Sequence, residues 1–335
     1  CLTPINQAKA QNTYSNPAEY MNDISRLLDN IQQNMWSYTN AVSHNKNARK
    51  IEKRRTEIVE TIKESKTYVW KMPSWKGDKT LRDSAYAYLK ISYAVITEDY
   101  SKLVDMEDVA EQSYDAMEAY ILAKQLAYNK QDSSLKMLNA QYKIFAAKNN
   151  ITLNDVKDKT AEKLEAAGKV YDYYNKMYLI FFKALKQEVY VMDALNKNNV
   201  SSLKQNIDAL NKFAVEGIEK TDAMPSFNSD GSIKSSCKEG LLFYKNESEK
   251  NLPIIADFLI KKETFEKIKK SIESKSASKR TQADVDAYNT AVADYNDATK
   301  VFNTTIQKIN DSRSKILTKW NESVNTFIDK HVPKN

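Results

Sequence analysis

Apolar residues recur at intervals of three and four positions along most of the chain, with polar residues between them. This spacing places apolar side chains on one face of an α-helix, so it predicts a series of amphipathic helices. Two longer stretches, at about 107–148 and 283–328, carry an apolar residue at every seventh position, as in a coiled-coil seam. The seam residues are Tyr114, Ile121, Tyr128, Leu135 and Tyr142, and then Tyr288, Tyr295, Phe302, Ile309 and Ile316.

A short motif interrupts the helical pattern twice. The sequence MPSWKGD at 72–78 returns 152 positions later as MPSFNSD at 224–230. Proline lacks a backbone donor and disfavours helix in the residue before it, so each motif predicts a corner at which one helix ends.

Two side chains in each corner have expected roles. Asp78 and Asp230 are expected to accept hydrogen bonds from the first amides of the next helix, where negative charge also suits the helix dipole. Trp75 and Phe227 are expected to fill the space between the helices that meet there. A ligand-binding role for these two aromatic residues is the alternative.

The repeated motif predicts two tandem copies of a four-helix unit, in an all-α chain built as an elongated bundle of long antiparallel helices. We expect a flexible tether at 1–16, a first repeat at 17–150 and a second repeat at 151–335. Overlaying the two seven-residue patterns requires an offset of 174 instead of 152, so the second repeat is expected to hold about 22 additional residues at about 261–281. Helices of about 40 residues span about 60 Å.

Composition agrees with long helices. Five glycines and six prolines among 335 residues leave few turn formers.

Most of the net charge of +7 falls in the predicted insertion. Its candidate basic contact surface consists of Lys261, Lys262, Lys267, Lys269, Lys270, Lys279 and Arg280. This surface is suited to acidic headgroups, lipopolysaccharide or an acidic partner, with a solvated helix face as the alternative. No nucleic-acid-binding motif accompanies it, so nucleic acid is not an expected partner.

The sequence contains few residues for catalysis or metal binding. His44 and His331 are the only histidines, which leaves too few for a histidine metal site or a hydrolase triad. No glycine-rich phosphate loop is present in the sequence. We therefore expect no catalytic residue, no metal and no cofactor other than a covalent lipid.

Cys1 is the expected attachment point of that lipid. Mature bacterial lipoproteins begin with a cysteine, exposed when a leader segment is removed. Two or more acyl chains anchor a protein stably, so we expect an outer-membrane location, with the cell surface favoured over the periplasmic face. The second cysteine, Cys237, is expected to be a buried small hydrophobic residue.

Several residues of the first half occur in one recognisable order. They are Cys1, then Asn16-Pro17 with Tyr20 and Ile24, then Lys71-Met72-Pro73 with Lys76-Gly77-Asp78 and Leu81-Arg82-Asp83. This order resembles a poorly characterised group of helical bacterial surface lipoproteins, named after a leptospiral surface protein and frequent in Bacteroidota. The resemblance covers mainly residues 1–150. It implies a helical, exported, lipid-anchored protein and does not imply any activity.

Two hypotheses of function follow. The first is a non-enzymatic outer-membrane lipoprotein that acts as an accessory or structural subunit of an outer-membrane protein complex for assembly, secretion or uptake. The alternative is a surface module that binds a glycan or small ligand held between the two helical repeats, near Trp75 and Phe227.

Overall fold

The fold is helical throughout the part of the chain that the structure describes. The computed structural model describes residues 14–44, 47–153 and 158–334. These ranges contain α-helices and short π-helical and 3₁₀ turns but no strand, which confirms the predicted all-α class. None of the helices in these ranges has the length and apolar character needed to cross a lipid bilayer.

The contacts between residues divide the chain into two compact units. The first unit contains the described residues up to Val170 and those from Ile328 onward, and the second unit contains Tyr171–Phe327. Both boundaries fall inside helices, because α6 (Lys159–Asn196) and α10 (Gln282–His331) each contribute to both units.

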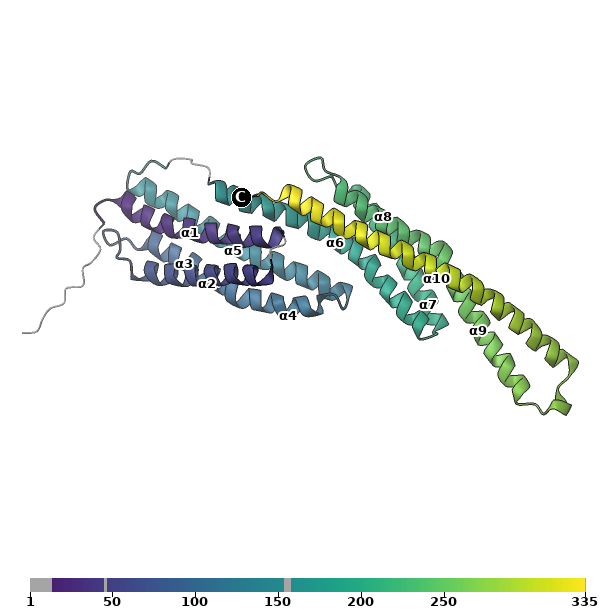
Figure 1. The fold of residues 1–335 in the computed structure, drawn as a ribbon. Coiled ribbons are helices and arrows are strands. Elements are labelled where there is room, and N and C mark those ends of the chain that lie inside the picture. The colour runs from purple at the N-terminus through teal and green to yellow at the C-terminus, as the bar shows by residue number, and fades with distance from the viewer. Residues whose placement is uncertain (1–13, 45–46, 154–157, 335) are drawn as a thin grey trace, which may run out of the picture. The chain divides into compact units, whose positions relative to one another are not determined.

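In the first unit α1 (Pro17–Ser43), α2 (Ala48–Lys71), α3 (Thr80–Ala94) and α5 (Tyr114–Lys148) run side by side (Figure 1). Asn16 begins α1 by accepting a hydrogen bond from the amide of Glu19, with Pro17 at the first helical position. Between α3 and α5 the first unit contains the π-helical turn η1 (Val95–Asp99) and α4 (Tyr100–Ala110).

The second unit contains the remaining elements together with most of α6 and α10. They are α7 (Val200–Ala223), α8 (Ser232–Asn246), the π-helical turn η2 (Glu247–Asn251), α9 (Leu252–Glu273) and the 3₁₀ turn η3 (Ala277–Lys279). Its fully buried side chains include Phe181, Leu210, Leu241, Tyr244 and Phe327.

Two helix boundaries differ from those that the periodicity predicts. The helix that follows the first corner passes through η1 into α4, and the stretch expected to be helical from about 107 to 148 is divided between α4 and α5. Ser113 begins α5 by accepting a hydrogen bond from the amide of Ala116, at 3.1 Å. This local cap interrupts the helix where the apolar spacing continues.

Pro253 lies where the helical hydrogen bonding changes in the second half. It lies in the first turn of α9, where a missing amide hydrogen removes no helical hydrogen bond. The turn η2 ends two residues before it. The predicted insertion at about 261–281 spans the second half of α9 and the turn that leads into α10.

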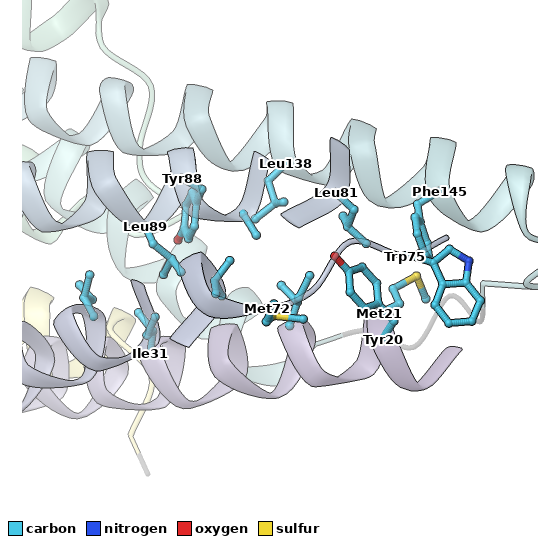
Figure 2. Packing of buried hydrophobic residues seen from close by; sticks show 14 of the residues in the cluster. Tyr20, Met21, Ile31, Met72, Trp75, Leu81, Tyr88, Leu89, Leu138 and Phe145 are labelled. Atoms are coloured by element: carbon cyan, nitrogen blue, oxygen red, sulfur yellow. The ribbon is translucent and has the colours of Figure 1, made fainter. Parts of the chain in front are cut away.

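The core of the first unit is continuous along the bundle. Figure 2 shows Tyr20 and Trp75 grouped with Phe145 at one end. The ring of Tyr20 lies 6.1 Å from that of Trp75 and 5.6 Å from that of Phe145. These contacts join α1, the first corner and α5, so the corner is part of the packed core.

Candidate functional site: an exposed helix face and a buried acid cluster

The first corner is a tight turn locked by reciprocal hydrogen bonds. The amide of Trp75 donates to the carbonyl of Asp78 at 3.0 Å, and the amide of Asp78 donates back at 2.9 Å. Lys76 and Gly77 have φ values of 48° and 87°, the positive pair that a type I′ turn requires. The carboxylate of Asp78 accepts from the amide of Thr80 at 2.8 Å, so the expected hydrogen bond to the next helix is present.

The second corner has the same backbone geometry. Asn228 and Ser229 have φ values of 47° and 65°, and the amide of Asp230 donates to the carbonyl of Phe227 at 2.8 Å. The carboxylate of Asp230 accepts from the amide of Ser232 at 2.8 Å.

A cation closes each corner. Arg82 donates to the carbonyl of Met72 at 3.0 Å, and Lys234 donates to the carbonyl of Met224 at 2.5 Å. A long side chain on the following helix thereby satisfies a carbonyl that the preceding helix leaves without an intrahelical donor.

The two corner aromatic residues pack inside their own units. Trp75 is 9% exposed and donates from Nε1 to Oδ1 of Asn149 at 2.8 Å. Phe227 is half-buried, with its ring 5.4 Å from that of Tyr173 and 5.5 Å from that of Phe327. These contacts support the gap-filling role of both residues.

The predicted basic surface divides into paired and exposed cations. Lys261 pairs with Asp257 at 3.0 Å, and Lys262 donates to Asn198 at 2.9 Å. Arg280 donates to the backbone carbonyls of Ile272 and Lys275. Arg280 is exposed, as are the four lysines at 267, 269, 270 and 279. Cys1, the expected lipidation site, lies outside the described residues.

The outward face of α5 carries an apolar stripe that the sequence interpretation missed. Leu122, Leu126, Met137 and Ile144 are exposed by 53%, 59%, 62% and 44%. Their spacings of four, eleven and seven residues place them on one face of the helix, and exposed alanines at 119, 140 and 147 continue it. We call this set of seven residues the α5 stripe.

The α5 stripe is separate from the core-facing side of α5. That side is formed by Met117, Ser134, Leu138 and Phe145, all of which are buried. The seven-residue seam from Tyr114 to Tyr142 predicts only the core-facing side of α5 and the edge of that side. A second apolar row on a helix whose core side is already complete is the signal that could have revealed the stripe.

Lysines border the α5 stripe on both sides. Lys130 pairs with Asp99 at 2.9 Å and Lys148 with Asp78 at 3.6 Å along one edge. Along the other edge Lys136 pairs with Asp132 at 2.6 Å, and Lys143 is exposed. The stripe is about 33 Å long from Leu122 to Ile144, at 1.5 Å per residue.

The positions of α10 that match the four large apolar residues of the stripe are polar, whereas the position that matches Ala119 is Val301, which is 49% exposed. Phe145 packs on Tyr20 beside the first corner, as Phe327 packs on Tyr173 beside the second, with ring distances of 5.6 and 5.7 Å. Matching these two phenylalanines relates Leu122, Leu126, Met137 and Ile144 to four exposed polar residues of α10. These are Thr304, Lys308, Lys319 and Thr326.

A buried cluster of ionisable groups lies in the second unit. Glu188 on α6, Glu247 on η2 and Tyr244 on α8 are 2%, 0% and 0% exposed. Arg313 on α10 donates from Nε to Oε1 of Glu188 at 2.5 Å, and its Nη2 lies 3.7 Å from Oε1 of Glu247. Both carboxyl oxygens of Glu247, the hydroxyl of Tyr244 and Nη2 of Arg313 are buried without a hydrogen-bond partner among the described residues.

Burial controls the protonation of this cluster. Loss of water, followed by the negative charge of Glu188, raises the pKa of Glu247 to about 9, although Arg313 opposes the change. Burial also raises the pKa of Glu188, which the adjacent guanidinium partly offsets. Glu247 is therefore the group that retains a proton near neutral pH.

The corresponding layer of the first unit is neutral and hydrogen-bonded. Gln131 on α5 donates to the hydroxyl of Tyr88 at 3.0 Å and to that of Ser92 at 2.7 Å, and both acceptors lie on α3. The matching of Phe145 with Phe327 places Gln131 at the position of Arg313. The side chains at these matched positions thus differ, since Gln131 is neutral in the first unit and Arg313 is charged in the second.

The remaining surface contains one further polar group of interest. Tyr14 and Tyr68 both donate to Oδ2 of Asp23 at 2.6 Å, and Arg26 pairs with the same carboxylate at 2.7 Å. These residues line an open depression.

In the described ranges, no three or more His, Cys, Asp or Glu side chains are arranged to hold a metal ion. No protein-family model, curated protein or solved structure matches the chain.

Proposed function

We propose that this chain is a non-enzymatic, lipid-anchored docking subunit of an outer-membrane protein complex, and that it binds its partner through the α5 stripe. The observation that carries the proposal is the apolar character of this outward face, set against the polar residues of α10 that match its four large apolar residues. An apolar row that the architecture does not need costs solubility, so its presence favours a binding role.

The proposed architecture is a duplicated helical unit in which only the first copy carries the stripe. Three pairs of elements support duplication, because the members of each pair have equal length and begin 152 positions apart. They are α2 and α7, α3 and α8, and η1 and η2. The helix caps agree, since Asn47 and Asn199 accept from the amides of Lys50 and Ser202 at 2.9 Å each.

The second copy is proposed to be extended in its last two helices. The helices α4 and α5 have 11 and 35 residues, whereas α9 and α10 have 22 and 50. Matching Phe145 with Phe327 gives an offset of 182, which favours about 30 additional residues over the 22 suggested by the seven-residue pattern. This extension carries the exposed lysines of the candidate basic surface, which is proposed to contact acidic headgroups, lipopolysaccharide or an acidic partner.

The proposed occupant of the α5 stripe is an amphipathic helix of the partner. The apolar side chains lie in two groups along about 33 Å of one face, with the exposed polar residues Asn129 and Ser133 between Leu126 and Met137, and such a face suits one side of another helix. The exposed Lys143 along one edge favours an acidic residue beside the partner's apolar face. Attachment through a lipid on Cys1 would place this face near proteins of the outer membrane.

Affinity purification of the full lipidated chain from its native membrane in mild detergent tests the proposal. The wild-type chain is expected to retain a stoichiometric outer-membrane partner, and the variant Leu126→Lys with Met137→Lys is expected to lose it. The matched control is Thr304→Lys with Thr326→Lys, which adds the same two charges to the corresponding face of α10. Both variants alter exposed positions, so their thermal unfolding should stay close to wild type.

The results separate the parts of the proposal. A partner that both variants retain would contradict docking through the stripe. A wild-type chain that purifies alone would contradict the subunit role. Mass spectrometry of the same sample shows whether Cys1 carries acyl chains.

The second candidate function is binding of a glycan or small ligand. The original form of this hypothesis places the ligand between the repeats, near Trp75 and Phe227. The depression around Asp23 offers a more accessible arrangement, with two tyrosines and one arginine around a carboxylate. Binding to an oligosaccharide array that is lost in Tyr68→Ala but retained in Trp70→Ala would favour this function. Absence of binding by the wild-type chain would remove it.

A further inference from the structure

The cluster of Glu188, Tyr244, Glu247 and Arg313 has no role in the proposed docking face, which lies in the other unit. Four separate elements meet in it, since Glu188 belongs to α6, Tyr244 to α8, Glu247 to η2 and Arg313 to α10. One guanidinium cannot neutralise two buried carboxylates. An uncompensated buried charge is strongly destabilising, so the second carboxyl group is expected to remain neutral.

Hydrogen bonding leads to the same assignment. Arg313 already donates to Glu188 at 2.5 Å, whereas its distance of 3.7 Å to Glu247 exceeds a hydrogen bond. Neither carboxyl oxygen of Glu247 has a hydrogen-bond partner among the described residues, yet Glu188 and Glu247 each shift the pKa of the other. A protonated Glu247 has an O–H that can be donated to Glu188, and this supplies the missing bond.

The groups around Glu247 do not supply a second positive charge, so a bound proton is what keeps its carboxyl group neutral. Glu188 comes from α6, Tyr244 from α8 and Arg313 from α10. From α7, the neutral residue Asn211 donates to Ser248, the residue after Glu247, at 3.0 Å. On α9, the charged residue Asp257 is exposed and paired with Lys261.

We propose that Glu188 and Glu247 form a proton-binding site in which a single shared proton holds η2 against α6 and α10, and that loss of this proton releases η2. The ligand of the site is a proton. A π-helical turn is a suitable place for such control, because its hydrogen bonding departs from the regular helix and such turns are frequent at functional sites. In the first unit the corresponding turn begins with Val95, which cannot titrate.

The sign of the pH effect follows from the raised pKa of Glu247. The folded chain keeps a proton that the unfolded chain releases above the ordinary value of 4.5. The stabilisation is therefore fully present below about pH 4.5 and declines as the pH rises toward about 9. Within this window the unfolding equilibrium constant of the second unit should rise about tenfold per pH unit through this group.

The test compares wild type with Glu247→Gln, which is a neutral mimic of the protonated acid, and with Glu249→Gln on the exposed side of the same turn. Urea unfolding is followed from near pH 6 to near pH 9, with hydrogen exchange of residues 244–252 corrected for its intrinsic pH dependence. Wild type and Glu249→Gln should lose stability and protection at η2 as the pH rises. Glu247→Gln should lose about one power of ten less per pH unit.

Parallel pH profiles for wild type and Glu247→Gln would overturn the proposal. A measurement on the wild-type chain covers the case in which the variant does not fold. The infrared spectrum of the native chain near pH 7 should contain the C=O stretch of a buried protonated carboxyl group, and its absence would also overturn the proposal. The docking experiment concerns the first unit, so either proposal can fail without the other.

Discussion

The ring of Phe181 occupies the space beside Gly240, so that a β-carbon at position 240 would lie 2.4 Å from Cε2 of that ring. The position that matches Gly240 at the 152-residue offset is Tyr88, which is 5% exposed in the core of the first unit. Leu28 occupies the place on α1 that aligns with Phe181 when Tyr20 is matched to Tyr173. In the second unit the large core side chain at this level, Phe181, lies on α6 and the small residue lies on α8. In the first unit the large side chain, Tyr88, lies on α3.

Gly240→Ala is expected to destabilise the second unit by about 1–3 kcal/mol, because the added methyl group overpacks a filled core. Urea unfolding followed by tryptophan fluorescence measures the change, since Phe181 stacks on Trp320 at 4.5 Å. Gly168→Ala is the matched control. Its β-carbon would make only ordinary contacts, the nearest at 3.7 Å, so this change should be neutral or stabilising. Equal destabilisation by both changes would contradict the packing argument.

Gly77→Ala is expected to destabilise the first unit by about 1 kcal/mol. Gly77 has a φ of 87° and nothing lies within 4 Å of a β-carbon there, so the cost is backbone strain alone. Ser229 occupies the same place in the second corner with a φ of 65°. The reverse change, Ser229→Gly, should therefore be neutral or stabilising by up to about 1 kcal/mol. Thermal unfolding of both variants checks the opposite signs.

Trp75→Phe is expected to cost about 1–3 kcal/mol, because it removes the hydrogen bond to Asn149 and part of a buried ring. A double-mutant cycle with Asn149→Ala isolates the hydrogen bond. The coupling energy should be about 1 kcal/mol and favourable. A coupling energy near zero would show that the indole contributes through packing alone.

Cys237 should resist thiol reagents in the folded chain. Burial raises the pKa of its thiol to about 12, so very little thiolate forms near pH 8. In a chain with Cys1→Ser, Ellman's reagent should react only as fast as the second unit unfolds. Adding urea should make the reaction immediate. Rapid modification without urea would show that the core around Cys237 opens independently of unfolding.

Local backbone chemistry explains which features can be predicted from the sequence. Pro73 and Pro225 define the corners because each follows the last residues of a helix, and proline disfavours helix in the residue before it. Asp78 and Asp230 have short side chains that reach only nearby amides, so their hydrogen bonds follow from their positions. The division between α4 and α5 escaped prediction because one Ser113 cap competes with a continuing apolar pattern.

The sequence by itself determined the helical class, the two corners and the hydrogen bonds that Asp78 and Asp230 accept from the next helix, since these depend on interactions over a few residues. Tertiary structure decided which apolar and charged side chains are covered. Leu126 and Leu138 are equally apolar, yet only packing leaves the first exposed and the second buried. Glu188 and Glu247 lie 59 positions apart in the chain, and only folding brings two carboxyl groups to one guanidinium away from water. Burial is a property of the assembled elements, so the chemistry that depends on it appears only in the folded chain.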